Sequence, residues 1–170
     1  LCMSSSGTYI LNDLIDSKKD SLHPRKKNRP IPSGKITRNQ AIILITTLLV
    51  ISEILAILLN VQFFILNSIL IASMIIYSIK IKNIFLMDVF SIAINYVFRA
   101  MAGAYLIDVK ISPWLIIGIF LLALLLAFGK RKSELMFLDK NLLEFRHVLK
   151  QYSQKILNYA IIITAAAVIL

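Results

Sequence analysis

Long apolar stretches separated by short charged segments make up most of the sequence. The uninterrupted stretches cover residues 41–59, 63–79, 84–107 and 113–128. Each is roughly 17–24 residues long, the length with which an α-helix crosses ~30 Å of hydrocarbon. Two further apolar stretches, 1–11 and 155–170, are too short for a complete span. The pattern therefore predicts an all-α, polytopic transmembrane helix bundle, with residues 1–170 forming a single domain truncated at both ends.

Two of the expected helix starts carry recognisable sequence signals. Thr37 followed by Gln40 has the spacing of a capping box. Ser112 followed by Pro113 has the residue types preferred just before a helix and at its first position. We therefore expect one helix to begin after Thr37 and another at Pro113.

Charged residues are concentrated between the apolar stretches. The chain has nineteen Lys and Arg residues against nine Asp and Glu residues, a net charge of +10. Most of the basic residues lie in 13–38, 80–83 and 130–152, and counting the spans places these loops on one side of the membrane. The opposite loops carry only Lys110. Because cytoplasmic loops are enriched in Lys and Arg, the basic side is predicted to face the cytoplasm.

The stretch 132–150 alternates charged and apolar residues at helical spacing. This pattern predicts an amphipathic helix lying on the membrane surface. His147, within that stretch, is expected to be solvated. His23 precedes a proline and is expected to shape a turn rather than to transfer protons.

An acidic motif follows the first apolar stretch. Asn12, Asp13, Asp16 and Asp20 are spaced so that all four side chains project from one face of a helix. Carboxylates stacked in this way repel one another unless a cation lies between them. Oxygen ligands that supply only part of a coordination shell suit Mg²⁺, which takes its remaining ligands from phosphate and water. The alternative is a solvated helix end whose acids pair with Lys18, Lys19 and Arg25.

A basic segment with three prolines, Pro24, Pro30 and Pro32, continues from the acidic motif. Its cations are Arg25, Lys26, Lys27 and Arg29. Pro24, Pro30 and Gly34 predict an extended, turning backbone from which these side chains project. Arg offers a planar fork to phosphate oxygens and Lys offers a point charge. An acidic cluster beside a stiff basic loop is the pattern expected for a metal-bound diphosphate; the alternative is an anchor for anionic lipid.

The stretch 84–107 contains one polar stripe, formed by Asp88, Ser91, Asn95 and Arg99. A charged Arg at this depth costs at least ~2.5–3.5 kcal/mol unless it finds partners. Asp88 is about 16 Å away along the helix axis, too far for a direct ion pair. Arg99 is therefore expected to meet another helix, water or a substrate phosphate. Glu53, also within a span, is expected to hydrogen-bond a neighbouring helix or to lie near the outer interface.

These motifs together resemble those of the UbiA prenyltransferase superfamily. Asn12-Asp13-x-x-Asp16-x-x-x-Asp20, followed by His23-Pro24, Arg29-Pro30 and Gly34, is similar to its first Asp-rich motif. Tyr77-Ser78-x-x-x-Lys82, or equally Lys80, resembles the Tyr/Lys turn after its fourth helix. The resemblance implies a UbiA-type fold of nine helices, of which the first and the last two are missing from this chain.

Later residues resemble one branch of that superfamily, the branch that makes decaprenylphosphoryl-5-phosphoribose. They are Asp88-Val89, Phe98-Arg99-Ala100-x-Ala102-Gly103 and Gly129-Lys130-Arg131-Lys132-Ser133-Glu134-Leu135. Most of the superfamily has a second Asp-rich motif at the last of these positions. Three cations stand there in this chain, and Glu134 and Asp139 are not on one face. The departure favours a direct phosphate clamp over a second metal site, although Glu134 could still bind metal or a ribose hydroxyl.

The resemblance implies transfer of 5-phosphoribose from 5-phosphoribosyl diphosphate to a polyprenyl phosphate in a bacterial plasma membrane. It implies that Asn12, Asp13, Asp16 and Asp20 hold Mg²⁺ and that the three aspartates are catalytic. The expected substrate-binding residues are Asn12, Arg25, Lys27, Arg29, Tyr77, Lys80, Arg99, Lys130, Arg131 and Glu134. The lipid bilayer is an expected partner and nucleic acid is not. Because phosphate is already anionic at neutral pH, no general base is required.

Two other functions remain open from the sequence. An aromatic or quinone prenyltransferase would use a polyprenyl diphosphate, but it would be expected to carry acids where Lys130, Arg131 and Lys132 stand. A transporter for an anionic solute would be expected to show broken helices and internal repeats, and neither is visible in the sequence.

Overall fold

The structure, a computed structural model, describes residues 1–23, 26–137 and 147–169. Every regular element within these ranges is helical, which confirms the predicted all-α class. The elements in chain order are α1 (Cys2–Asp20), η1 (Lys26–Asn28), α2 (Arg38–Leu59), α3 (Val61–Ile79), η2 (Ile81–Asn83), α4 (Met87–Leu106), α5 (Pro113–Phe137), α6 (His147–Lys150) and α7 (Gln154–Ile169).

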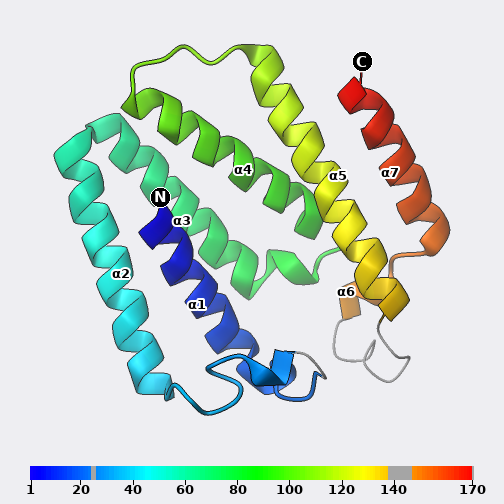
Figure 1. Ribbon diagram of the computed structural model, residues 1–170, viewed down its shortest axis with the longest axis horizontal. Coiled ribbons are helices and arrows are strands. Elements are labelled where there is room, and N and C mark those ends of the chain that lie inside the picture. Colours follow the sequence, from blue (N-terminus) through cyan, green and yellow to red (C-terminus); the bar gives the residue numbers. More distant parts are fainter. Residues whose placement is uncertain (24–25, 138–146, 170) are drawn as a thin grey trace.

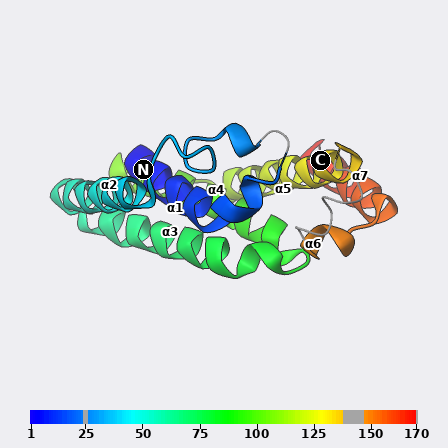
Figure 2. The same ribbon diagram turned by 90° about the horizontal axis from the view of Figure 1, so that it is seen from below.

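The helices form a flat bundle in which consecutive long helices run antiparallel (Figure 1). α1 packs against both α2 and α3, α3 packs against α4, and α5 lies between α4 and α7. Seen edge on, α3 lies below α1 and α2 (Figure 2). This arrangement brings one end of each of α1, α3, α4 and α5 together.

Four of the helices are long and apolar enough to cross a membrane: α2, α3, α4 and the Pro113–Met136 part of α5. Only 17–28% of the residues in their apolar windows are buried inside the protein. Most of these side chains therefore face outward, as a hydrocarbon environment requires. Residues 21–23 and 26–37, η2 and the C-terminal end of α5 lie at one end of the bundle (Figure 1). The α2–α3 turn and the 107–112 connection lie at the other end, so the basic segments share one side.

Close packing holds α1 against α2, and hydrogen bonds between side chains link α2 to α3. A Cβ at Gly7 would lie 3.0 Å from Leu49 Cδ2, so only glycine permits this approach without a shift of the leucine. Asn67 Nδ2 donates to Glu53 Oε1 at 2.8 Å, and Ser68 Oγ donates to Glu53 Oε2 at 2.8 Å. The expectation that Glu53 hydrogen-bonds a neighbouring helix is confirmed. Within a span, these bonds offset the desolvation of the carboxyl group.

The predicted capping box at the start of α2 is confirmed, because Thr37 and Gln40 bond reciprocally there. α4 begins at Met87, three residues later than the apolar pattern suggested, after Leu86 at a φ of 65°. The separate surface helix expected over 132–150 is wrong for its first part, since residues up to Phe137 continue α5. Residues 138–146 lie outside the described part of the chain.

Candidate active site

A cavity of about 460 Å³ opens among α1, η2, α3, α4 and α5, at the end where the basic segments lie. This volume is within the usual range for small-molecule sites. The cavity is lined by seven Lys and Arg side chains against four Asp and Glu side chains. The excess positive charge favours an anionic ligand.

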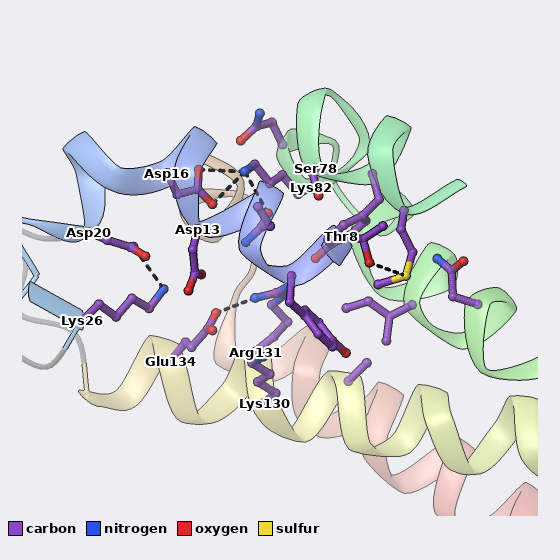
Figure 3. Close-up of a pocket in the computed structure, with 18 of the residues that line it drawn as sticks. Thr8, Asp13, Asp16, Asp20, Lys26, Ser78, Lys82, Lys130, Arg131 and Glu134 are labelled. Carbon is purple, nitrogen blue, oxygen red and sulfur yellow. Dashed lines mark hydrogen bonds and ion pairs between the residues drawn. The ribbon is translucent and has the colours of Figure 1, made fainter. Parts of the chain in front are cut away.

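Two of the motif residues bind Lys82, which η2 carries into the cavity. Lys82 Nζ lies 2.7 Å from both carboxylate oxygens of Asp16 and 3.2 Å from Asn12 Oδ1. Figure 3 shows Asp16 and Lys82 pointing at one another. Because Lys82 is only 8% exposed, the Asp16 carboxylate has a partner that water screens little. The acid and the base come from segments that are 66 residues apart.

The other two aspartates bind the loop between α1 and α2. Arg29 Nη1 donates to Asp13 Oδ1 at 2.6 Å and to Asp20 Oδ2 at 3.0 Å. Lys26 Nζ lies 3.7 Å from Asp20 Oδ1 (Figure 3). Burial raises the pKa of Asp13 above its ordinary value, and Arg29 opposes that rise. The acids thus meet cations from other segments, not their helical neighbours.

The oxygen ligands fit Mg²⁺ only as part of a shared coordination shell. Among the described residues, no group of three or more His, Cys, Asp or Glu side chains is placed to hold a metal ion by itself. The motif is split instead into two pairs, Asn12 with Asp16 and Asp13 with Asp20, and each pair is already bound to a cation. Such pairs suit a hard cation that takes its remaining ligands from phosphate and water.

On the α5 wall of the cavity, Arg131 is held by two carboxylates. Its Nε donates to Asp88 Oδ2 at 2.7 Å, and its Nη1 donates to Glu134 Oε2 at 2.5 Å. Arg131 is 1% exposed and Asp88 is fully buried. Tyr152 completes the group, because its hydroxyl donates to Asp88 Oδ1 at 2.6 Å and accepts from the Leu86 N–H at 3.1 Å. Burial, reinforced by Asp88, raises the pKa of Tyr152, so its hydroxyl stays protonated.

This network changes the expected role of Arg131. The sequence suggested a phosphate clamp, but two of its nitrogens are already used within the protein. Glu134 is likewise used by Arg131. Lys130, the preceding cation, lines the cavity and is exposed. Lys130 is therefore the cation of this wall whose side chain remains exposed to the cavity and solvent.

Ten of the residues predicted for the site line the cavity: Asn12, Asp13, Asp16, Asp20, Arg29, Tyr77, Arg99, Lys130, Arg131 and Glu134. Lys27 does not line the cavity and is exposed, and Lys26 lines it instead. Of the two lysines that the Tyr/Lys motif left open, Lys82 lines the cavity and Lys80 is exposed outside it. Arg25 lies outside the described residues. His23 lines the cavity, and its Nδ1 accepts from the Lys26 N–H at 3.3 Å.

Comparison with known proteins assigns the chain to a family. The family model for the UbiA prenyltransferase family matches residues 1–135. The chain belongs to the UbiA prenyltransferase family. A solved UbiA homolog from Archaeoglobus fulgidus, bound to GPP and Mg²⁺, superimposes with a TM-score of 0.85 over 98% of this chain and 59% of that one, at 18% identity. That likeness confirms the UbiA fold.

Curated relatives of this UbiA protein have several names. The decaprenyl-phosphate phosphoribosyltransferase of Mycolicibacterium smegmatis is 27% identical over 99% of this chain and 53% of the relative. The enzyme of the same name from Corynebacterium glutamicum is 26% identical over 99% of this chain and 52% of the relative. A 4-hydroxybenzoate octaprenyltransferase of Blochmanniella pennsylvanica is 43% identical over 35% of this chain and 20% of the relative. The chain thus spans about half the length of the two phosphoribosyltransferases it matches.

Proposed function

We propose that this UbiA protein, as part of its full-length form, transfers 5-phosphoribose from 5-phosphoribosyl diphosphate to a polyprenyl phosphate. The observation that carries the proposal is the character of the α5 wall, opposite the Asp-rich motif of α1. Lys130 is exposed there, and Glu134, the only described acid of that wall that lines the cavity, is bound to Arg131. A wall that offers positive charge suits a second phosphate-bearing substrate bound without a second metal.

The reaction follows from the charges that the cavity holds. An oxygen of the polyprenyl phosphate attacks the anomeric carbon of the ribose, and the bond from that carbon to the diphosphate oxygen breaks. The acceptor phosphate is already an anion, so the cavity needs to supply no general base. The barrier lies in the negative charge that develops on the departing diphosphate and in the oxocarbenium-like ribose. Cationic side chains aimed at that charge lower the barrier.

The residues of α1 and its following loop are assigned to the leaving group. Asn12, Asp13, Asp16 and Asp20 would hold Mg²⁺, which when bound neutralises diphosphate charge. Arg29 and Lys82, which bind these acids in the structure, are assigned to contact the same diphosphate. Lys130 is assigned to orienting the second phosphate.

We further propose that the cavity faces the cytoplasm of a bacterial cell, because the basic segments surround it. The donor, 5-phosphoribosyl diphosphate, is water-soluble, and the acceptor, polyprenyl phosphate, is membrane-bound. A cavity at the basic end of the spanning helices admits the first from water and the second from the bilayer.

The test is an incubation of membranes containing the full-length protein with labelled 5-phosphoribosyl diphosphate and a polyprenyl phosphate. We expect Mg²⁺-dependent appearance of label in the lipid fraction, absent in membranes carrying the Asp16→Asn variant. A parallel incubation offers a polyprenyl diphosphate and an aromatic acceptor such as 4-hydroxybenzoate. Product only in the parallel incubation would replace our proposal with an aromatic prenyltransferase.

A further inference from the structure

Arg99 differs from the other cations that reach the interior of the cavity. Its side chain is partly buried within the membrane-spanning helix α4. Its Nη2 lies 3.6 Å from Met74 Sδ, and its Cζ lies 5.7 Å from the centre of the Tyr96 ring. Among the residues that the structure describes, Arg99 Nε is the one buried side-chain polar atom without a hydrogen-bond partner. No carboxylate of the described residues forms an ion pair with Arg99.

The remaining cavity cations are either paired or exposed. Lys26, Arg29, Lys82 and Arg131 each bind at least one Asp or Glu. Lys19 and Lys130 are exposed to solvent. An aromatic face and a thioether stabilise a guanidinium far less than a carboxylate does. Arg99 is therefore a charge placed in the spanning region without the anion that such a position requires.

The position of Arg99 separates it from the Asp-rich motif. Met74 Sδ accepts from Thr8 Oγ1 at 3.3 Å as well as from Arg99, so Arg99 lies near the Thr8 level of α1. Thr8 precedes Asp16 by eight residues, or about 12 Å along the helix axis. The nearby amide of Asn95 is already engaged, because it bonds Ser73 and the Ser91 carbonyl. Arg99 thus lies at the inner end of the cavity, away from the acids, with its Nε donor unpaired.

We propose that Arg99 binds a phosphate monoester at this inner end, separate from the diphosphate held at the acidic motif. A guanidinium presents a planar fork that matches two phosphate oxygens. The inference rests on the proposed function, because both substrates of the proposed reaction carry a phosphate monoester. These groups are the terminal phosphate of the polyprenyl acceptor and the 5-phosphate of the ribosyl donor. Arg99 discriminates in favour of ligands that carry the phosphate over otherwise identical ligands that lack it.

The kinetic test uses the full-length protein with Arg99→Gln, which removes the charge, and Arg99→Lys, which keeps the charge but not the fork. Arg38→Gln is the matched control, because Arg38 is exposed at the start of α2 and does not line the cavity. We expect Arg99→Gln to raise KM for one substrate by roughly 10- to 150-fold, the value of a charge-assisted phosphate contact. Arg99→Lys should recover part of the loss. A raised KM for the polyprenyl phosphate would show that Arg99 binds the acceptor phosphate. A raised KM for 5-phosphoribosyl diphosphate would show that Arg99 binds the 5-phosphate of the donor.

A binding test does not depend on turnover. The thermal stability of the purified protein in detergent is measured with a short polyprenyl phosphate against the corresponding alcohol, and with ribose 5-phosphate against ribose. We expect one phosphorylated ligand to stabilise the wild type and the Arg38→Gln control, and to stabilise Arg99→Gln and Arg99→Lys less. If the wild type lacks phosphoribosyl transfer but shows this Arg99-dependent stabilisation, the proposed function fails and the phosphate site stands.

Two results would contradict the proposed phosphate site at Arg99. Wild-type transfer combined with unchanged KM values in both Arg99 variants, or stabilisation that is equal for the phosphorylated and unphosphorylated ligands, would overturn the assignment. Should Arg99→Gln fail to fold, Arg99→Lys carries the test, because it keeps the positive charge that Tyr96 and Met74 contact.

Discussion

Replacing Asp88 by Asn tests whether the Arg131 network holds the α5 wall in place. Asp88 is fully buried, and each of its carboxylate oxygens accepts one bond: Oδ1 from the Tyr152 hydroxyl and Oδ2 from Arg131 Nε. An Asn side chain at this position replaces one oxygen by an NH₂ donor. That donor faces either Arg131, which can only donate, or Tyr152, whose oxygen already accepts from the Leu86 N–H. In either orientation one of the two bonds that Asp88 accepts is lost, either the bond from Arg131 Nε or the bond from the Tyr152 hydroxyl.

The cost can be estimated from the charges that remain. Breaking a buried ion pair by removing one partner destabilises a protein by about 3–5 kcal/mol, because the other charge stays buried. Arg131 keeps its 2.5 Å contact with Glu134, so it is not left wholly uncompensated. We therefore expect Asp88→Asn to lower the free energy of unfolding by about 3 kcal/mol, the lower end of that range.

The assay is reversible unfolding of the purified full-length protein in mixed detergent micelles, followed by circular dichroism. Asp108→Asn is the control, because Asp108 is exposed, has a φ of 53° and sits in a conformation that Asn also tolerates. If Asp88→Asn unfolds at the same detergent fraction as Asp108→Asn, the Arg131–Asp88 pair does not stabilise the fold and Arg131 returns as a candidate phosphate ligand.

Three further predictions concern the motif, the turn lysines and the orientation. Asp16→Asn should abolish transfer at any Mg²⁺ concentration while the protein still folds in detergent; normal turnover by this variant would refute the metal assignment. Lys82→Gln should lower kcat/KM for the diphosphate donor by roughly 10- to 150-fold, whereas Lys80→Gln should change it less than about twofold. A larger loss of kcat/KM in Lys80→Gln than in Lys82→Gln would show that η2 presents Lys80 to the cavity. With Cys2 replaced by Ser, a cysteine at Lys27 should react with a membrane-impermeant maleimide from the cytoplasmic side and one at Lys110 from the opposite side; labelling of both from one side would contradict the span count.

The helices and the acidic motif were predictable because each depends on nearby residues. Runs of apolar residues predict spans from their length alone, and the Thr37–Gln40 capping box fixes the start of α2 locally. Asp13, Asp16 and Asp20 share a helix, so their spacing places them together before any tertiary contact is known. The end of α5 was not predictable in this way. The apolar pattern stops near the membrane boundary, but Arg131 and Glu134 pair at i,i+3 and the helix continues to Phe137.

The residues that pair with Asp16 and Arg131 could not be predicted from the sequence. Asp16 and Lys82 are 66 residues apart, and Arg131 and Asp88 are 43 apart. Nothing local distinguishes Lys80 from Lys82 either. The choice depends on the short η2 turn, which leaves Lys80 exposed at the end of α3 and buries Lys82 beside Asn12. Tyr152 lies beyond the matched family region, and its sequence context gives no sign that it reaches Asp88.

The pairing of the acids with Arg29 and Lys82 has a consequence for the order of events in the proposed reaction. Three carboxylates at the cavity are balanced by Arg29, Lys82 and Lys26. With Mg²⁺ and diphosphate both bound, the three carboxylates would hold the metal, and Arg29, Lys82 and Lys26 would be left to face the diphosphate. This arrangement keeps every buried charge compensated, which neither the metal nor the diphosphate achieves alone. Donor and Mg²⁺ should therefore bind with positive coupling, and donor affinity measured by calorimetry without Mg²⁺ should be weaker than with it. Equal affinity in both conditions would show that the acids do not hold the metal.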